Sequence, residues 1–278
     1  MGDPSDETAR AFLEARFRAV PVAGAGRLTG YFMPVYEARW SRGGEFTAPV
    51  RPRPADLPPG DLSSGGRAAY ASRAAIDERP ASDALAWMRP EDLFFMQIQG
   101  AGVLIFDGGR REKAVFAGDN GAPFVGIAAP MRARGLFVDQ ETSAEAIHAW
   151  LAQHRGPEAA AIMVLDPRYV FYNLTADDGF DPLGAAGQRL PAGRSVAVDP
   201  TFHAMGELLW LDASAPSLAG AFPTYRRVAA ALDTGGAIKG PARADLYLGR
   251  GPAAGAEAGR VRHVLTLYRL VPIPRSEP

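Results

Sequence analysis

The chain has 278 residues, of which 47% are apolar, and it carries 30 basic and 31 acidic side chains. This is enough apolar material for one large domain or two modest ones, and a balanced charge without a basic block argues against a nucleic-acid partner. Cysteine is absent, which excludes disulfides, thiolate zinc sites and cysteine nucleophiles. No apolar run is long enough to predict a membrane-spanning helix.

The N-terminal part of the chain predicts a helix, a strand and a long loop. Residues 5–17 predict a short helix, because Ser5 can cap it and acidic residues occupy its first turn. Residues 30–36 have the composition of a strand. The proline- and glycine-rich residues 43–66 then predict a surface excursion or a crossing between domains.

The middle of the chain begins with a predicted hairpin. Residues 94–106 predict a strand, interrupted by Gly100 and Gly102, that pairs with residues 113–117 through a turn at residues 107–109. The segment Gly100-Ala101-Gly102 lacks the third glycine and the following helix of a dinucleotide-binding loop, so we interpret it as a kink in this strand.

Two helices are predicted next. The clearest covers residues 143–154, with Thr142 and Glu145 as a capping box and an apolar stripe on one face. A second, shorter helix is expected to open at Pro157 and to end before residue 166.

The last third of the chain predicts mostly short strands. They cover residues 194–198, 207–211, 226–232, 246–248 and 261–271. Strands at such spacing, with few helices between them, indicate a small closed barrel.

Two carboxylates near the C-terminal end form the most distinctive pattern. Asp233 ends one β-like run, Asp245 opens the next, and a glycine-rich segment joins them. Glycines carry no Cβ and let the backbone fold closely around a ligand, and a pair of acids suits acid–base chemistry on a sugar or peptide bond. The alternative is that both aspartates only terminate strands of the barrel.

Other catalytic patterns are weaker. Asp233-Thr234-Gly235 also resembles the active loop of aspartic proteases, but one copy would require a homodimer. The histidines predict no metal site: His148 and His154 are six residues apart on one helix, which does not place them on one face, and His203 and His263 stand alone.

Six segments together resemble the MltA family of lytic murein transglycosylases and follow the family's order. They are residues 28–39, 95–102, 120–121, 167–172, 193–199 and 233–245. The closing part resembles the 3D domain, which is named for three aspartates; here they correspond to Asp199, Asp233 and Asp245.

The resemblance implies a mainly β protein with two domains. Residues 1–34 and 180–278 would form a double-psi β-barrel catalytic domain. Residues 35–179 would form a smaller, β-rich domain inserted into it, and a groove for a glycan strand would lie between the two.

The resemblance also implies the reaction, which is cleavage of the β-1,4 bond between N-acetylmuramic acid and N-acetylglucosamine without water. A 1,6-anhydromuramoyl end is left. Asp245 would act as acid and then as base, with its pKa raised by apolar neighbours such as Leu246 and by the charge of Asp233. We expect Asp233 to orient Asp245 or the loop, and Asp199 to have a structural or supporting role.

Further residues are expected to contact the glycan. Tyr31, Gln99 and Gly100 would line the groove, and backbone N–H groups of the loop would bind sugar substituents. The loop residues are Gly235, Gly236, Lys239 and Gly240.

The resemblance sets the expected partners and location as well. The expected partners are peptidoglycan strands and other proteins of cell-wall synthesis or hydrolysis. We expect a monomer without metal or cofactor, in the periplasm, as an outer-membrane lipoprotein whose leader has been removed. The competing hypothesis is a non-catalytic peptidoglycan-binding or scaffolding module on the same barrel.

Overall fold

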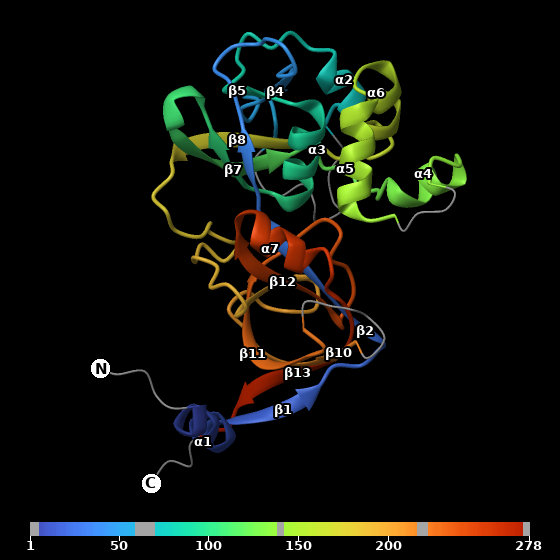
Figure 1. The fold of residues 1–278 in the computed structure, drawn as a ribbon. Helices are drawn as coiled ribbons and strands as arrows, with labels where there is room; N and C mark the ends of the chain where they lie inside the picture. The colour runs from blue at the N-terminus through green and yellow to red at the C-terminus, as the bar shows by residue number, and fades with distance from the viewer. Residues whose placement is uncertain (1–5, 59–69, 138–141, 216–221, 275–278) are drawn as a thin grey trace. The chain divides into compact units, whose positions relative to one another are not determined.

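The computed structural model describes residues 6–58, 70–137, 142–215 and 222–274, and the chain divides into two compact units (Figure 1). The barrel unit comprises Met1–Tyr31, Leu183–Gly249 and Ala256–Pro278. The inserted unit comprises Phe32–Pro182 and Arg250–Gly255. The chain therefore leaves the first unit and returns to it, but the inserted unit spans the longer stretch of sequence and is not the smaller one.

The barrel unit is built on a closed sheet. Its strands are β1 (Phe17–Pro21), β2 (Gly26–Met33), β9 (Ser195–Val198), β10 (Leu208–Ser214), β11 (Thr224–Asp233), β12 (Arg243–Arg250) and β13 (Arg262–Pro272). The sheet order is β1-β13-β10-β11-β9-β12-β2, and β2 also pairs with β13, so that six strands close and β1 stays at the margin. The predicted closed barrel and its five C-terminal strands are confirmed.

Alternation along the strands creates the barrel core. In β13, His263, Leu265 and Leu267 are buried, whereas Val264 between them is exposed. This period of two is what a sheet with one buried face requires. Helix α1 (Asp6–Arg16) belongs to this unit and confirms the predicted N-terminal helix, whereas α7 (Gly251–Ala258) is divided between the two units. The expected cap Ser5 lies outside the described residues.

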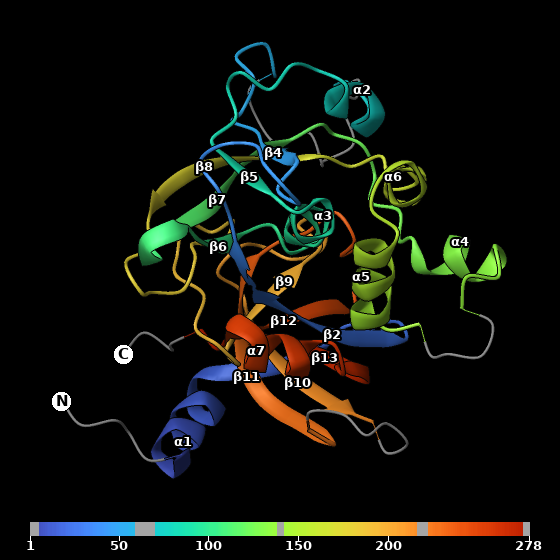
Figure 2. The same cartoon turned by 45° about the horizontal axis from the view of Figure 1, so that its top comes forward.

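The inserted unit combines sheets with helices. Strands β3 (Val35–Glu37), β6 (Gly102–Ile105), β7 (Arg111–Asp119) and β8 (Val170–Ala176) form one sheet, and β4 (Ala48–Val50) pairs with β5 (Ala86–Met88). The helices are α2 (Arg73–Asp77), α3 (Pro90–Gln99), α4 (Ala128–Ala133), α5 (Ala144–Gln153) and α6 (Pro157–Met163). Helices α3 to α6 share an apolar cluster, and α3, α5 and α6 lie together in both views (Figures 1 and 2). This unit therefore contains helices as well as strands, while the chain as a whole is mainly β, as predicted.

Helix α3 corrects the strand predicted over residues 94–106. Pro90 occupies the first turn with two acidic residues, and Gly100 ends the helix with a φ of 86°. These are start and stop signals of a helix, which the nearly continuous apolar run concealed because such a run fits either period. Only the second half of the segment, β6, is a strand, and it forms the predicted hairpin with β7.

Helices α5 and α6 lie where they are predicted, but the cap of α5 differs. Ser143 is the N-cap, and its Oγ accepts a hydrogen bond of 3.1 Å from the N–H of Ala146. The helix therefore starts one residue later than a cap at Thr142 would place it, and Glu145 is not at the third position that a capping box requires. Within the described ranges, no helix has both the length and the apolar composition to cross a membrane.

Candidate functional site

Two neighbouring strands of the barrel, β2 and β12, present polar side chains on their outward faces. Arg27, Thr29 and Tyr31 alternate along β2, and Arg243 and Asp245 alternate along β12. We call these five residues the β2–β12 strip. Residues that alternate with them and face the barrel core are fully buried: Leu28, Ala244 and Leu246.

Asp245 is held by a neutral hydroxyl. The Oγ1 of Thr29 donates a hydrogen bond to Oδ1 of Asp245, and Nη2 of Arg243 donates to the same Thr29 oxygen at 2.8 Å. Because a hydroxyl has a single proton, the donation from Arg243 directs the proton of Thr29 toward Asp245. Thr29 therefore fixes the orientation of the carboxyl group.

Burial raises the pKa of Asp245, and the charge of Asp233 adds to this effect. The hydrogen bond from Thr29 and the charge of Arg243 oppose the rise without cancelling it. Leu246, which we expected to contribute, lies on the opposite face of β12 in the barrel core. The expected direction of the shift is thus found, whereas the expected apolar neighbour is wrong.

Asp233 lies at the end of β11, next to an irregularity in its pairing with β9. Its Oδ2 accepts a hydrogen bond of 2.7 Å from the Tyr31 hydroxyl, and its Oδ1 accepts one of 3.1 Å from the N–H of Ala185. Burial raises the pKa of Asp233, and the bond from Tyr31 lowers it by less. Its observed hydrogen-bond partner in the strip is Tyr31, whose ring centroid lies 5.3 Å from that of Tyr247.

Asp199 anchors the loop between Asp233 and Asp245. Its Oδ2 accepts a hydrogen bond of 2.8 Å from the N–H of Gly240, and its Oδ1 accepts bonds from Thr201. Burial acts to raise its pKa, but these bonds, with that from Gly240 first, hold the pKa below its usual value. Gly240 has a φ of 103°, which favours glycine. Since its N–H is engaged inside the protein, Gly240 shapes the loop and does not offer that group to a sugar.

His203, for which the sequence predicted no role, also holds this loop. Its Nε2 lies 2.6 Å from the carbonyl oxygen of Pro241, and its Nδ1 lies 3.0 Å from a carboxylate oxygen of Glu207. The ring therefore links the loop to Glu207. Glu207 is held in turn by Arg269.

The remaining predicted residues fall in two places. Gly235 and Gly236 form a turn closed by a 2.9 Å bond from the N–H of Ile238 to the Gly235 carbonyl, and the Lys239 side chain is exposed. Gln99 and Gly100 lie in the inserted unit, at the end of α3, where Oε1 of Gln99 accepts a 3.1 Å bond from the N–H of Phe32.

Sequence reasoning missed Thr29 and Arg243. Each lies two residues before a residue that was singled out, Tyr31 and Asp245. Because side chains two apart on a strand share a face, the period of two was the signal that could have found them. In the described parts of the chain, no three His, Asp or Glu side chains gather as metal ligands.

Comparisons with known proteins agree on one family. Residues 27–173 match the model of the MltA specific insert domain, and residues 194–271 match that of the 3D domain. The membrane-bound lytic murein transglycosylase A of Escherichia coli K12 is 33% identical over 258 residues, which cover 90% of this chain and 67% of that protein. The protein of the same name from Vibrio cholerae is 28% identical, with 97% and 72% covered.

Solved structures give the same result. The crystal structure of a membrane-bound lytic murein transglycosylase from Agrobacterium tumefaciens has a TM-score of 0.84 and 31% identity, and the match covers 98% of this chain and 81% of that one. E. coli MltA with bound chitohexaose has a TM-score of 0.74 and 30% identity, with 90% and 72% covered. The resemblance carried by the six segments is thereby confirmed, and the chain belongs to the MltA family of lytic murein transglycosylases.

Proposed function

We propose that this protein cleaves peptidoglycan strands between N-acetylmuramic acid and N-acetylglucosamine without water and leaves 1,6-anhydromuramoyl ends. Relatives that cover most of the chain are named lytic murein transglycosylases, and a related structure holds chitohexaose. Both observations support a β-1,4-linked amino-sugar polymer as the substrate. Their name, membrane-bound, supports a location in the cell envelope, and we propose a periplasmic, lipid-anchored monomer.

The observation that carries the proposal is the setting of Asp245. Its direct partner is the hydroxyl of Thr29 rather than a cation, and burial raises its pKa. A carboxyl group in this setting holds its proton to higher pH than a solvated one, as a general acid requires. Asp233 is a second carboxyl group with a raised pKa, and it accepts a hydrogen bond from the Tyr31 hydroxyl.

One carboxyl group suffices for the proposed reaction. Asp245 donates its proton to the glycosidic oxygen, the bond from that oxygen to C1 of the muramic acid breaks, and the N-acetylglucosamine leaves with a free hydroxyl. The C6 hydroxyl of the same muramic acid then bonds to C1 and returns its proton to the Asp245 carboxylate. Because this nucleophile is tethered to the substrate, proximity replaces the water and the second carboxylate that a hydrolase uses.

The other residues position this chemistry. We propose that Asp233 fixes Tyr31 beside the reacting sugars and that Asp199 and His203 hold the loop. Lys239 and the turn at Gly235 and Gly236 are proposed to contact the glycan. Gln99 and Gly100 of the inserted unit are proposed to contact it as well.

The test compares the wild type with Asp245→Asn on purified peptidoglycan, with soluble products identified by mass spectrometry. We expect anhydromuropeptides from the wild type and a loss of about a thousandfold in rate for the variant, which is within the range for removal of a general acid and base. Asp212→Asn is the matched control, because Asp212 is also a barrel aspartate but pairs with Arg226 at the surface.

Two results would contradict the proposal. Products with reducing ends, heavier by one water, would indicate a hydrolase with an unrecognised second catalytic group. No product from the wild type, combined with intact binding to peptidoglycan, would indicate a non-catalytic binding module.

A further inference from the structure

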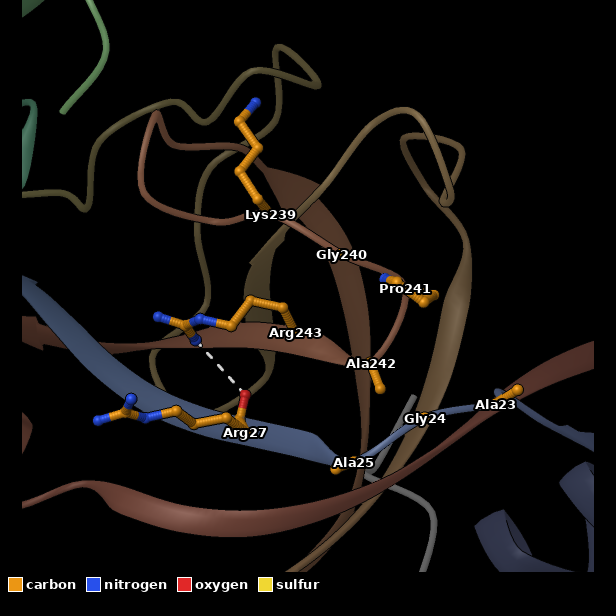
Figure 3. A pocket seen from close by; sticks show the side chains of 9 residues that line it. All are labelled: Ala23, Gly24, Ala25, Arg27, Lys239, Gly240, Pro241, Ala242 and Arg243. Atoms are coloured by element: carbon orange, nitrogen blue, oxygen red, sulfur yellow. Dashed lines mark hydrogen bonds between the residues drawn. The ribbon is translucent and has the colours of Figure 1, made fainter.

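A pocket of about 160 Å³ lies at the cationic end of the β2–β12 strip (Figure 3). Residues before and at the start of β2 form one part of its wall, and the end of the loop and the start of β12 form the other. The lining residues are Ala23, Gly24, Ala25, Arg27, Lys239, Gly240, Pro241, Ala242 and Arg243. The mechanism above gives roles to Lys239 and Arg243 but assigns no ligand group to the pocket itself.

The pocket carries positive charge and no acidic lining residue. Its three charged residues are Arg27, Lys239 and Arg243. Among the described residues, neither Arg27 nor Lys239 forms an ion pair, and the side chains of both are exposed. In Figure 3 the Arg27 and Arg243 side chains extend in the same direction, and Lys239 projects from the loop. Adjacent cations attract an anion, although Asp199 lies within electrostatic range of Lys239 and Asp245 within that of Arg243.

Arg243 is the most constrained of the three cations. Burial lowers the pKa of Arg243, and the neighbouring charge of Arg27 adds to this effect, while Asp245 opposes it. When Asp245 holds its proton, as the proposed resting state requires, this compensation is lost. An anion in the pocket would then restore a negative charge beside the two arginines.

The rest of the wall is formed by small residues. Gly24 has a φ of 111° and open space where a Cβ would lie, and alanines flank it. Small, mostly backbone walls leave room for a compact group such as a carboxylate, whose two oxygens match the fork of an arginine guanidinium. None of the described residues that line the pocket is aromatic, so none of them could stack against a sugar ring.

The pocket is close to the reacting carboxyl along the strip. Arg243 and Asp245 are two positions apart on one face of β12, which corresponds to about 7 Å. A ligand group in the pocket would therefore belong to the substrate near its scissile bond. The glycan backbone of peptidoglycan is uncharged, whereas the peptide attached to muramic acid carries carboxylates.

We propose that this pocket binds a carboxylate of the peptide on muramic acid, so that the enzyme prefers peptide-bearing strands to naked ones. The inference rests on the proposed function, since it identifies the form of the substrate that the same site selects. Arg27 is a specificity-determining residue in this scheme, and Lys239 and Arg243 assist it.

The test uses three forms of one glycan: peptide-bearing strands, the same strands with their carboxylates amidated, and strands stripped of peptide. The variant is Arg27→Gln, which keeps the backbone carbonyl that accepts a hydrogen bond from Arg243. The matched control is Arg18→Gln, which removes an exposed arginine from β1 of the same unit. Thermal unfolding checks that all proteins are folded.

We expect the wild type and Arg18→Gln to cleave peptide-bearing strands with a kcat/KM about tenfold above that for the other two forms, which is the scale of one charge-assisted contact. Arg27→Gln should lose this preference through KM, with kcat nearly unchanged. The preference should also fall with added salt. Equal cleavage of all forms by the wild type, or a preference retained in Arg27→Gln, would overturn the inference.

A binding measurement separates this inference from the proposed function. Asp245→Asn and Asp245→Asn/Arg27→Gln are titrated with soluble fragments of the three glycan forms. A preference that depends on Arg27 supports the pocket even if the wild type makes no anhydro product, in which case only the proposed reaction fails. Equal affinities of both proteins for all fragments refute the pocket, whatever the wild type cleaves.

Discussion

Buried carboxyl groups of the two units have different partners. In the inserted unit, Asp119 is bound by Arg168 at 2.8 Å, and Asp177 is bound by Arg250 at 2.7 Å. Both carboxyl groups are nearly inaccessible, and each has a guanidinium beside it. Such pairs hold segments of the chain together.

In the barrel unit, the carboxyl groups of the proposed active site meet hydroxyls instead. Asp245 accepts from Thr29, and Asp233 accepts from Tyr31. Burial raises the pKa of both groups. In contrast, the pKa of Asp177 is lowered, because its bonds to Arg250 and Arg111 outweigh burial. The pKa of each of these three aspartates thus follows the balance between burial and its partners: two arginines outweigh burial at Asp177, whereas a hydroxyl donor does not at Asp245 or Asp233.

The largest effect on stability is expected where an ion pair between a buried carboxylate and an arginine is broken. Asp177→Asn leaves Arg250 and Arg111 without their shared carboxylate, and we expect a loss of about 3 kcal/mol in the free energy of unfolding. Urea denaturation at neutral pH measures this value. Asp212→Asn, which breaks an exposed pair, should cost less than about 0.5 kcal/mol. Equal costs for both variants would show that the burial of Asp177 does not matter.

Removal of the hydroxyl that donates to Asp245 should change the reaction more than the stability of the fold. Thr29→Val removes the donor to Asp245 and should lower kcat/KM about tenfold, because the carboxyl loses its orientation. Since the bond from Thr29 lowers the pKa of Asp245, the loss of activity at alkaline pH should move to higher pH in Thr29→Val. Thr29→Ser should restore both properties. An unshifted pH profile would exclude control of Asp245 by Thr29.

The smallest expected effect concerns how the free energy of unfolding depends on pH. The contributions of Asp245 and Asp177 to this dependence should have opposite signs. A carboxyl group whose pKa is raised in the folded state stabilises the protein at pH values below its pKa in the unfolded chain, which is about 4. This contribution is lost as the pH rises through the pKa of the folded state. Asp245→Asn should therefore be more stable than the wild type at neutral pH, and this advantage should fade as pH falls toward about 4.

The contribution of Asp177 is present above the unfolded pKa and is lost only as pH falls through its lowered folded pKa. Thermal unfolding of Asp245→Asn, Asp177→Asn and the wild type from neutral pH to about pH 3 resolves both curves. If the stabilities of Asp245→Asn and Asp177→Asn relative to the wild type changed with pH in the same way, the proposed difference between the two carboxyl groups would be wrong.

Much of the protein could be predicted from local patterns in its sequence. The order of six weak motifs identified the family, and the short alternating runs after residue 194 predicted the strands of the barrel. The capping serine and apolar stripe of α5 and the proline of α6 depend on neighbours within one or two turns. Such signals are local, so they can be read without the fold. The strand predicted over α3 failed because an unbroken apolar run satisfies both periods.

The partners of the aspartates depended on contacts that are distant in sequence. Thr29 and Asp245 are 216 residues apart, and Tyr31 and Asp233 are 202 apart. The sequence determined that carboxyl groups border a glycine-rich loop. Only the barrel, which makes β2 a neighbour of β12, decided that hydroxyls donate hydrogen bonds to these groups. Register across a closed sheet is a global property, and it sets which residues approach each carboxyl group and hence its pKa.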